Sequence, residues 1–214
     1  MKVYAIGGLG ADERVFSYLK LNFELEVLQW IPPLKKEALA DYAKRMLDQI
    51  DKEEEFILLG VSFGGMLAVE MAKLRKPIKL ILISSAVNIK DIPFLFRVFG
   101  KTHLIKLLPA TFLKAPDFIN NYFFSVKREE DKQLLKQIIH DTDPDFLKWA
   151  IGQILSWQGK ALAVQLIRIH GTADRLLNCS SGKDKVEWIE GGGHFMVVDR
   201  ADEISQLLNS KVEE

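Results

Sequence analysis

The chain has 214 residues, and its 29 lysines and arginines balance 29 aspartates and glutamates, so its formal net charge is zero. That length suffices for one domain with a sizeable buried core, or for one domain that carries an insertion. Balanced charge gives no field strong enough to hold nucleic acid or an anionic membrane surface. The single cysteine, Cys179, excludes an internal disulfide, and no apolar run approaches the length of a membrane span, so a cytoplasmic location is expected.

Along the chain, short apolar runs alternate with amphipathic patterns. The apolar runs predict strands at 3–6, 25–28, 56–59, 78–83, 165–170 and 186–189. Helices are predicted at 12–20, 35–50, 66–74 and 201–209. Because the strands are apolar at nearly every position, they suit a parallel sheet that is covered on both faces. The alternation therefore predicts an α/β fold with a doubly wound, mainly parallel sheet.

This alternation is interrupted once, between residues 88 and 158. The sequence there predicts helices only, at 94–99, 103–108, 117–124, 129–139 and 145–155. A connection of about 70 residues is far too long for an ordinary crossover. We therefore expect a helical cap at 88–158, inserted into a core formed by 1–87 and 159–214. It follows the fourth strand, on the side where open α/β sheets bind ligands.

The segment Gly60-Val61-Ser62-Phe63-Gly64 directly follows the third predicted strand and precedes a helical pattern. Glycine, any residue, serine, any residue, glycine in that context is typical of a nucleophile elbow, which holds its serine in a strained, exposed position. The turn needs glycines because a side chain at those places would collide with the neighbouring strand or helix. The alternative is a glycine-rich turn with an incidental serine. Ser62 is the candidate nucleophile.

A serine hydroxyl needs a base to remove its proton, and the chain has four histidines. His103 and His140 fall in the cap, where surface positions are expected. His170 ends a predicted strand, where a packed, hydrogen-bonded histidine is expected. His194 follows three consecutive glycines in the loop between the last strand and the last helix. That loop can reach over the sheet edge, so His194 is the candidate base for Ser62.

The base in turn needs a carboxylate that orients its ring. Asp174 comes just after the fifth predicted strand, one strand before His194 on the same sheet edge. The order serine, acid, histidine along the chain is that of one class of hydrolases. Asp91, after the fourth strand, and Asp199, close after His194, remain rival acids. Arg175 is either an exposed loop charge or a salt-bridging residue that positions the acid loop.

A tetrahedral intermediate also needs two preorganised amide donors for its oxyanion. The amide of Phe63 is one candidate because it lies at the positive end of a helix. The amide of Leu9 is the other, in the glycine-rich loop 7–10 after the first strand. Such a loop could instead bind a dinucleotide, but it lacks the full glycine fingerprint. We therefore expect no cofactor, and we assign no metal ligands.

With these segments the chain resembles the α/β-hydrolase superfamily over nearly its whole length. Within it, the chain is similar to the small capped carboxylesterase-like hydrolases of bacteria. Gly7-Gly8 stands where such proteins usually have His-Gly, so a side chain that often braces the oxyanion loop is missing. The chain also begins at what would be the third strand of the superfamily, so the N-terminal hairpin is missing. The resemblance implies six strands in the spatial order 2-1-3-4-5-6.

The resemblance implies that Ser62, His194 and Asp174 hydrolyse an ester or thioester through an acyl-enzyme. A small-molecule substrate with a largely apolar acyl group is expected from the aromatic residues of the cap. These are Phe94, Phe96, Phe99, Phe112, Phe118, Phe123, Phe124, Trp149 and Trp157. Two alternatives stay open because fold does not dictate function. One is a carbon–carbon bond hydrolase or lyase with the same triad, and the other is a binding protein with negligible turnover.

Overall fold

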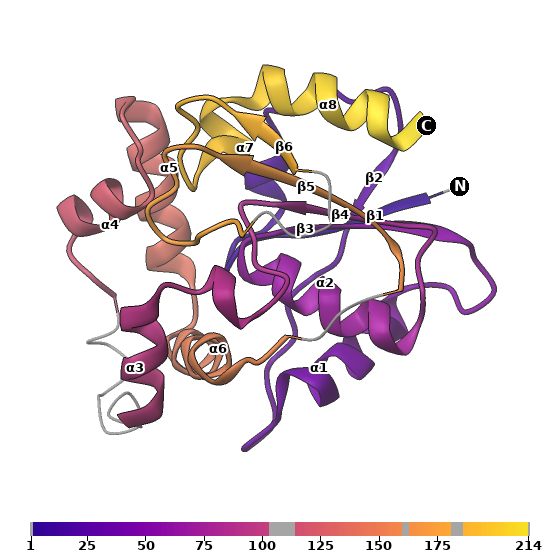
Figure 1. Ribbon diagram of the computed structural model, residues 1–214, viewed down its shortest axis with the longest axis horizontal. Helices are drawn as coiled ribbons and strands as arrows, with labels where there is room; N and C mark the ends of the chain where they lie inside the picture. The colour runs from indigo at the N-terminus through magenta and orange to yellow at the C-terminus, as the bar shows by residue number, and fades with distance from the viewer. Residues whose placement is uncertain (1, 103–113, 160–162, 181–185, 214) are drawn as a thin grey trace.

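A single sheet forms the centre of the molecule in the computed structural model, which describes residues 2–102, 114–159, 163–180 and 186–213 (Figure 1). Among these residues six parallel strands pair in the order β2-β1-β3-β4-β5-β6, which confirms the predicted topology. The strands are β1 (Lys2–Ile6), β2 (Leu25–Val27), β3 (Phe56–Val61), β4 (Lys79–Ile83), β5 (Gln165–Gly171) and β6 (Val186–Ile189). The central strands β3 and β4 are buried at every position, as a sheet covered on both faces requires.

Helices cover both faces of the sheet. In Figure 1, α1 (Leu39–Met46) and α2 (Phe63–Leu74) lie on one face, and α7 (Met196–Asp199) and α8 (Ala201–Glu213) lie on the other. Because side chains alternate along a strand, β3 supplies both apolar layers. Leu58 belongs to the cluster with α1 and α2, whereas Ile57 belongs to the cluster with α7 and α8.

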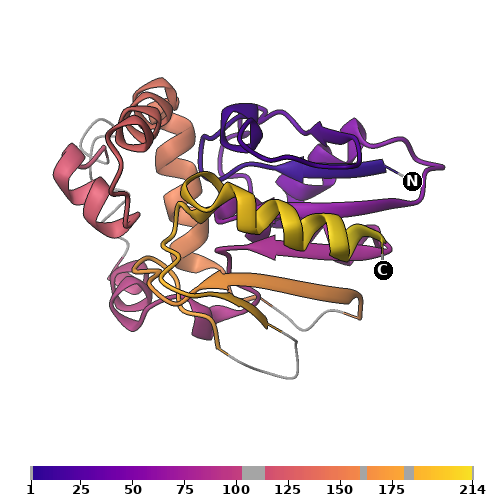
Figure 2. The ribbon, with the colours of Figure 1, turned by 90° about the horizontal axis from the view of Figure 1, so that it is seen from above.

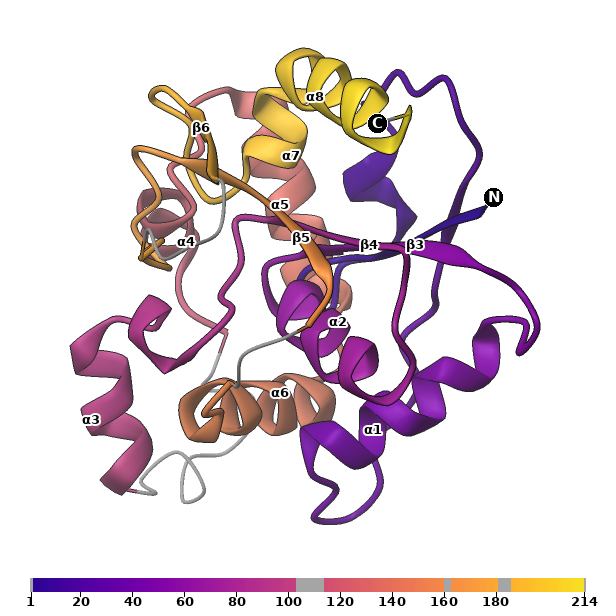
Figure 3. The ribbon, with the colours of Figure 1, turned by 45° about the vertical axis from the view of Figure 1, so that its right-hand side comes forward.

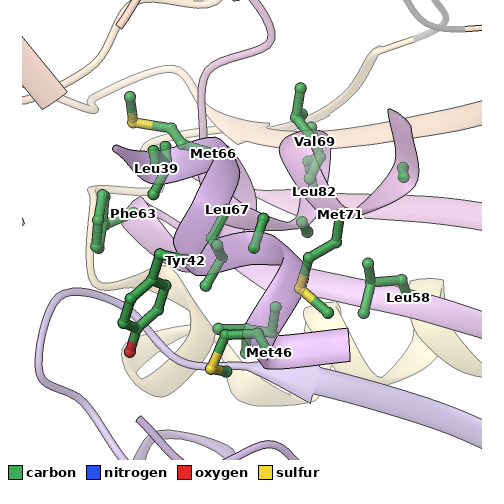
Figure 4. Packing of buried hydrophobic residues seen from close by; sticks show 14 of the residues in the cluster. Leu39, Tyr42, Met46, Leu58, Phe63, Met66, Leu67, Val69, Met71 and Leu82 are labelled. Carbon is green, nitrogen blue, oxygen red and sulfur yellow. The ribbon is translucent and has the colours of Figure 1, made fainter. Parts of the chain in front are cut away.

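A layer of buried apolar side chains joins α1 and α2 to the sheet. Figure 4 shows Tyr42 and Met46 of α1 gathered with Met71 of α2 and Leu58 of β3, and all four are buried. Each fully buried side chain of this size contributes roughly 1.5–3 kcal/mol relative to an exposed one. This packing fixes α2, and with it the position of the turn that α2 begins from.

The predicted cap is present as a group of helices at one end of the sheet. It contains α3 (Phe94–Thr102), α4 (Asp117–Phe123), α5 (Glu129–Asp141) and α6 (Pro144–Ser156). These helices lie at the end of the sheet opposite the N-terminus, where the parallel strands finish (Figure 2). Figure 3 shows α6 beside α2 and α3. The predicted helix 103–108 lies outside the described residues, and the boundaries 88 and 158 stay a prediction.

Two predicted helices are shorter than expected. Residues 12–20 form only a short 3-10 helix, Glu13–Phe16, because its buried residues Val15 and Phe16 are adjacent and give no helical stripe. The predicted helix 35–50 begins only at Leu39, because Lys36 has φ +62°, which no α-helix admits. Neither change moves a candidate site residue. Within the described ranges, no helix combines the length and the apolar character needed to cross a membrane.

Candidate active site

Ser62 lies in the tight turn between β3 and α2. Its backbone has φ 52° and ψ −120°, which is a strained conformation for a residue with a side chain. Two hydrogen bonds hold it: the Ser62 amide donates to Ile83 O at 3.0 Å, and Ser85 Oγ donates to Ser62 O at 2.6 Å. The second glycine of the motif, Gly64, leaves no room for a side chain, since a Cβ there would lie 2.1 Å from Gly7 O. The elbow therefore presents the Ser62 side chain in one fixed direction.

The three predicted site residues meet at the carboxyl edge of the sheet. Ser62 Oγ lies 2.7 Å from His194 Nε2, and His194 Nδ1 lies 2.8 Å from Asp174 Oδ2. The side chains of His194 and Asp174 are only 3% and 1% exposed. Because a carboxylate oxygen can only accept, Nδ1 carries the proton and donates it to Asp174. Nε2 is then left as the acceptor for the Ser62 hydroxyl.

The Asp174 carboxylate is anchored on both oxygens. Oδ1 accepts the amides of Leu176 at 2.9 Å and Leu177 at 3.1 Å, while Oδ2 accepts from His194. Burial by itself would raise the pKa of Asp174, but the charge and hydrogen bond of His194 and the nearby His170 outweigh it. The pKa of Asp174 is lowered, so the group is ionised at neutral pH, as an orienting acid must be.

Among the described contacts, neither rival acid bonds to His194. Asp91 is fully buried, and its carboxylate accepts from Arg168 Nη2 at 3.0 Å and from the Ser180 amide at 2.8 Å. Asp199 lines a surface crevice, and burial, followed by the charge of Asp131, raises its pKa. Asp91 therefore serves the core, and the geometry favours Asp174 as the acid.

The other histidines are placed differently. His140 is exposed in the cap, as predicted, and His103 lies outside the described residues. His170 is packed, as predicted, with Nε2 donating to Leu177 O at 3.2 Å. The same atom lies 3.4 Å from Asp174 Oδ2, a contact that the sequence reasoning missed. Its position four residues before the acid, at the end of the same strand, is the signal that could have revealed it.

Both predicted oxyanion donors lie beside Ser62. Leu9 and Phe63 line the same cavity as Ser62. The loop of Leu9 passes against the nucleophile, since a Cβ on Gly8 would lie 3.7 Å from Ser62 Cβ. Phe63 begins α2, so its amide has no acceptor within the helix. In the part of the chain that the structure describes, the Leu9 amide also donates to no acceptor. Two amides are thus available near the serine.

A cavity of about 340 Å³ opens onto Ser62 and His194. Its lining is mainly apolar, and the polar side chains among the described lining residues are Ser62, His194, Asn120 and Thr142. No Asp, Glu, Lys or Arg side chain lines it within the described ranges. Such a cavity fits a neutral, apolar group, because a buried charge would find no counter-charge there.

The cap aromatics divide into three groups. Phe96 and Phe124 line the cavity. Phe94 and Phe118 are exposed, by 67% and 74%, so they do not support the apolar preference. The remaining described ones pack among other apolar side chains or in ring contacts: Phe123, Trp149 and Trp157. The side chains of Phe99 and Phe112 lie outside the described residues.

Residues 122–126, which run from the end of α4 into the connection to α5, bind the cap to the loop of the acid. Ser125 Oγ donates to Ala173 O at 3.1 Å. Arg175 Nη1 donates to Tyr122 O at 2.9 Å, and its guanidinium lies 4.2 Å from the centre of the Tyr122 ring. Arg175 is exposed, as the first of its two predicted roles had it. Its described contacts with the cap are to a main-chain carbonyl and an aromatic ring, not to a carboxylate.

The same segment also binds the loop of the base. The Phe195 amide donates to Phe124 O at 3.3 Å. The Phe124 ring meets the His194 ring edge to face, with centroids 5.3 Å apart. From the sequence Phe124 is predicted only as a cap aromatic, so this contact with His194 is a new finding. The cap therefore forms one wall of the site and holds its imidazole in place.

Several solved structures superimpose on the whole length of this chain. An esterase from Exiguobacterium antarcticum superimposes with a TM-score of 0.79 at 17% identity, covering 100% of this chain and 92% of that one. A thermophilic esterase from Thermogutta terrifontis gives 0.76 at 14% identity, with 100% and 89% covered. A bromoperoxidase from Bacillus anthracis gives 0.73 at 15% identity, with 100% and 92% covered. At such identities the likeness establishes the fold alone.

The comparison by sequence is more specific for the family. No curated protein sequence matches the chain. The model of the alpha/beta hydrolase family, however, matches residues 22–207, from β2 to the middle of α8. That range includes the elbow, the cap and the loops of Asp174 and His194. Fold, sheet order and family model agree, and the chain belongs to the alpha/beta hydrolase family.

Proposed function

We propose that the protein is a serine hydrolase that cleaves an ester or thioester of a small, neutral, largely apolar acyl group. The observation that carries the proposal is the unbroken series of contacts from Ser62 through His194 to Asp174, which opens onto an apolar cavity. Membership of the alpha/beta hydrolase family and esterase-like structures support hydrolysis as the reaction.

In this mechanism Ser62 Oγ attacks the acyl carbon while His194 Nε2 takes its proton. Asp174 keeps the proton of Nδ1 in place and stabilises the imidazolium that forms. The negative oxygen of the tetrahedral intermediate accepts hydrogen bonds from the amides of Leu9 and Phe63. His194 then returns the proton to the leaving alcohol or thiol, and an acyl-enzyme forms. Water, deprotonated by His194, then attacks the acyl-enzyme, and His194 passes that proton to Ser62 Oγ as the acid is released.

The substrate class follows from the cavity. Its volume of about 340 Å³ lies near the lower end of the range for small-molecule pockets, roughly 300–1,000 Å³. An acyl group with a carboxylate or phosphate would lose its hydration there without meeting a cation among the described lining residues. We therefore expect p-nitrophenyl acetate and butyrate to be turned over, and a succinyl half-ester of similar size to be poor.

The experiment that tests the proposal compares Ser62→Ala with Ser156→Ala, which removes a hydroxyl on an exposed part of α6. Ser62→Ala should abolish turnover of p-nitrophenyl butyrate and labelling by a fluorophosphonate, while Ser156→Ala should keep both. Turnover by Ser62→Ala at the wild-type rate contradicts the proposal. A wild type that is labelled at Ser62 but hydrolyses neither oxygen esters nor thioesters supports the binding-protein or carbon–carbon alternatives instead.

A further inference from the structure

The oxyanion loop, residues 7–11, has little with which to hold its own shape. Three of its five residues are glycines, which gain the most freedom when a loop loosens. In the described part of the chain its one internal hydrogen bond runs from the Ala11 amide to Gly8 O at 2.9 Å. The Ala11 carbonyl folds back over Gly7, where a Cβ would lie 2.4 Å from Ala11 O. Thr142 and Gly64 pack against the loop at Gly10 and Gly7, but the polar contact that fixes the Ala11 carbonyl also sets the direction of the Leu9 amide.

Trp30, three residues after β2, makes the contact that fixes it. Its Nε1–H donates to Ala11 O at 2.9 Å. Its ring also stacks on the ring of Phe63, with centroids 5.6 Å apart and planes 13° from parallel. The ring of Phe146 also packs against Trp30, with the two ring centroids 5.1 Å apart. One half-buried side chain thus touches both segments that supply the candidate oxyanion donors.

We propose that Trp30 is a positioning residue that sets the Leu9 and Phe63 amides at the spacing the oxyanion requires. The inference rests on the proposed function, since it assigns Trp30 a part in the same site. Trp30 does not line the described cavity, so it acts through the two backbone segments and not on the substrate. Donors stabilise a developing oxyanion only when they are already in place, and a misplacement of about 1 Å can cost up to about a hundredfold in rate.

A purely structural role for Trp30 makes a different prediction. If the ring only fills space, its loss lowers stability and leaves the chemistry of the folded enzyme unchanged. If it sets the donors, kcat falls while KM stays, because the oxyanion forms only in the transition state. Affinity for a trifluoromethyl ketone, which forms a tetrahedral adduct with serine, should fall together with kcat.

The test variant is Trp30→Phe, which keeps the ring on Phe63 and removes the N–H. The matched control is Trp149→Phe. Trp149 is also half-buried, its Nε1–H donates to a main-chain carbonyl, Glu37 O, at 2.8 Å, and its ring meets Phe63 at 6.0 Å. The control therefore loses the same kind of bond in the same aromatic cluster without releasing the oxyanion loop. Both variants are checked by thermal denaturation and studied below their melting temperatures.

Two measurements decide the matter. Amide hydrogen exchange of peptides covering residues 7–11 should be faster in Trp30→Phe than in the wild type and in Trp149→Phe. With p-nitrophenyl butyrate, Trp30→Phe should lose about tenfold or more in kcat with KM within twofold, and Trp149→Phe should lose neither. Unchanged exchange, or an equal loss of kcat in both variants, overturns the inference. Failure of the proposed function shows separately, as turnover that survives Ser62→Ala.

Discussion

Replacement of Asp174 by asparagine tests the geometry of the site most directly, because the structure fixes which way the new amide must face. The two amides of Leu176 and Leu177 need an oxygen at the position of Oδ1. The asparagine nitrogen then occupies the position of Oδ2, 2.8 Å from His194 Nδ1. Since an amide nitrogen donates, Nδ1 must become the acceptor and the proton moves to Nε2. His194 can no longer take the proton of Ser62.

The expected loss in kcat for Asp174→Asn is about 10⁴-fold, the size found when a wrong tautomer disables a triad of this kind. That factor corresponds to about 5.5 kcal/mol of activation free energy. The assay is steady-state hydrolysis of p-nitrophenyl butyrate at pH 7.5, with circular dichroism to verify the fold. Asp199→Asn, at the rival acid, is the control and should stay within threefold of the wild type. If Asp174→Asn kept more than a tenth of the kcat, or if Asp199→Asn lost as much, the assignment of the acid would be wrong.

Four further changes probe the core, the elbow and the cavity. Asp91→Ala strips the carboxylate from the Arg168 guanidinium, which is 2% exposed, and should lower the free energy of unfolding in urea by about 3–5 kcal/mol. Burial lowers the pKa of His170, so below about pH 6.5 the unfolded chain binds a proton that the folded chain does not, and the free energy of unfolding decreases as the pH is lowered. His170→Gln should therefore reduce the drop in melting temperature between pH 7 and pH 5. Gly64→Ala puts a methyl group onto Gly7 O and should give little folded, active protein on expression. Ile151→Trp narrows the cavity and should reduce kcat/KM for p-nitrophenyl octanoate far more than for the acetate.

Each of these has an outcome that would contradict it. An Asp91→Ala variant as stable as the wild type would mean that water replaces the ion pair at no cost. An unchanged pH profile in His170→Gln would exclude His170 as a source of acid sensitivity. Wild-type activity in Gly64→Ala would show that the elbow has room to spare. If Ile151→Trp lowered kcat/KM equally for the acetate and the octanoate, the acyl chain would not occupy this cavity.

The sheet and the site could be predicted from local patterns. Runs such as 56–59 and 78–83 are apolar at nearly every position, which is the mark of strands buried on both faces. The glycines around Ser62 and before His194 mark turns where only a residue without a Cβ fits, as the 2.1 Å approach at Gly64 illustrates. Parallel topology then brings the ends of β3, β5 and β6 to one edge. The apolar runs, the positions of the glycines and the parallel topology were therefore enough to predict the candidate triad.

The rest depended on contacts between distant segments, which no local pattern records. The helix expected from 35 begins at Leu39 because Lys36 takes a left-handed conformation while the Glu37 carboxylate accepts the Leu34 amide at 2.7 Å. The stacking of Trp30 on Phe63 joins segments that are 33 positions apart along the printed sequence. Such partners are chosen by tertiary packing, so apolar character alone marks them as buried without saying what they touch.

The contacts between residues 122–126 and the loops of Asp174 and His194 limit which parts of the cap can be exchanged by protein engineering. A main-chain hydrogen bond joins Phe195 to Phe124, the Ser125 hydroxyl donates to Ala173 O, and the Phe124 ring packs edge to face on the His194 imidazole. A chimera that exchanged the whole cap for that of another hydrolase would also remove the contacts that hold the loops of the candidate acid and base, Asp174 and His194. Grafts that alter α3, whose Phe96 lines the cavity, and leave α4–α6 native should preserve turnover, so new specificities are best engineered from α3.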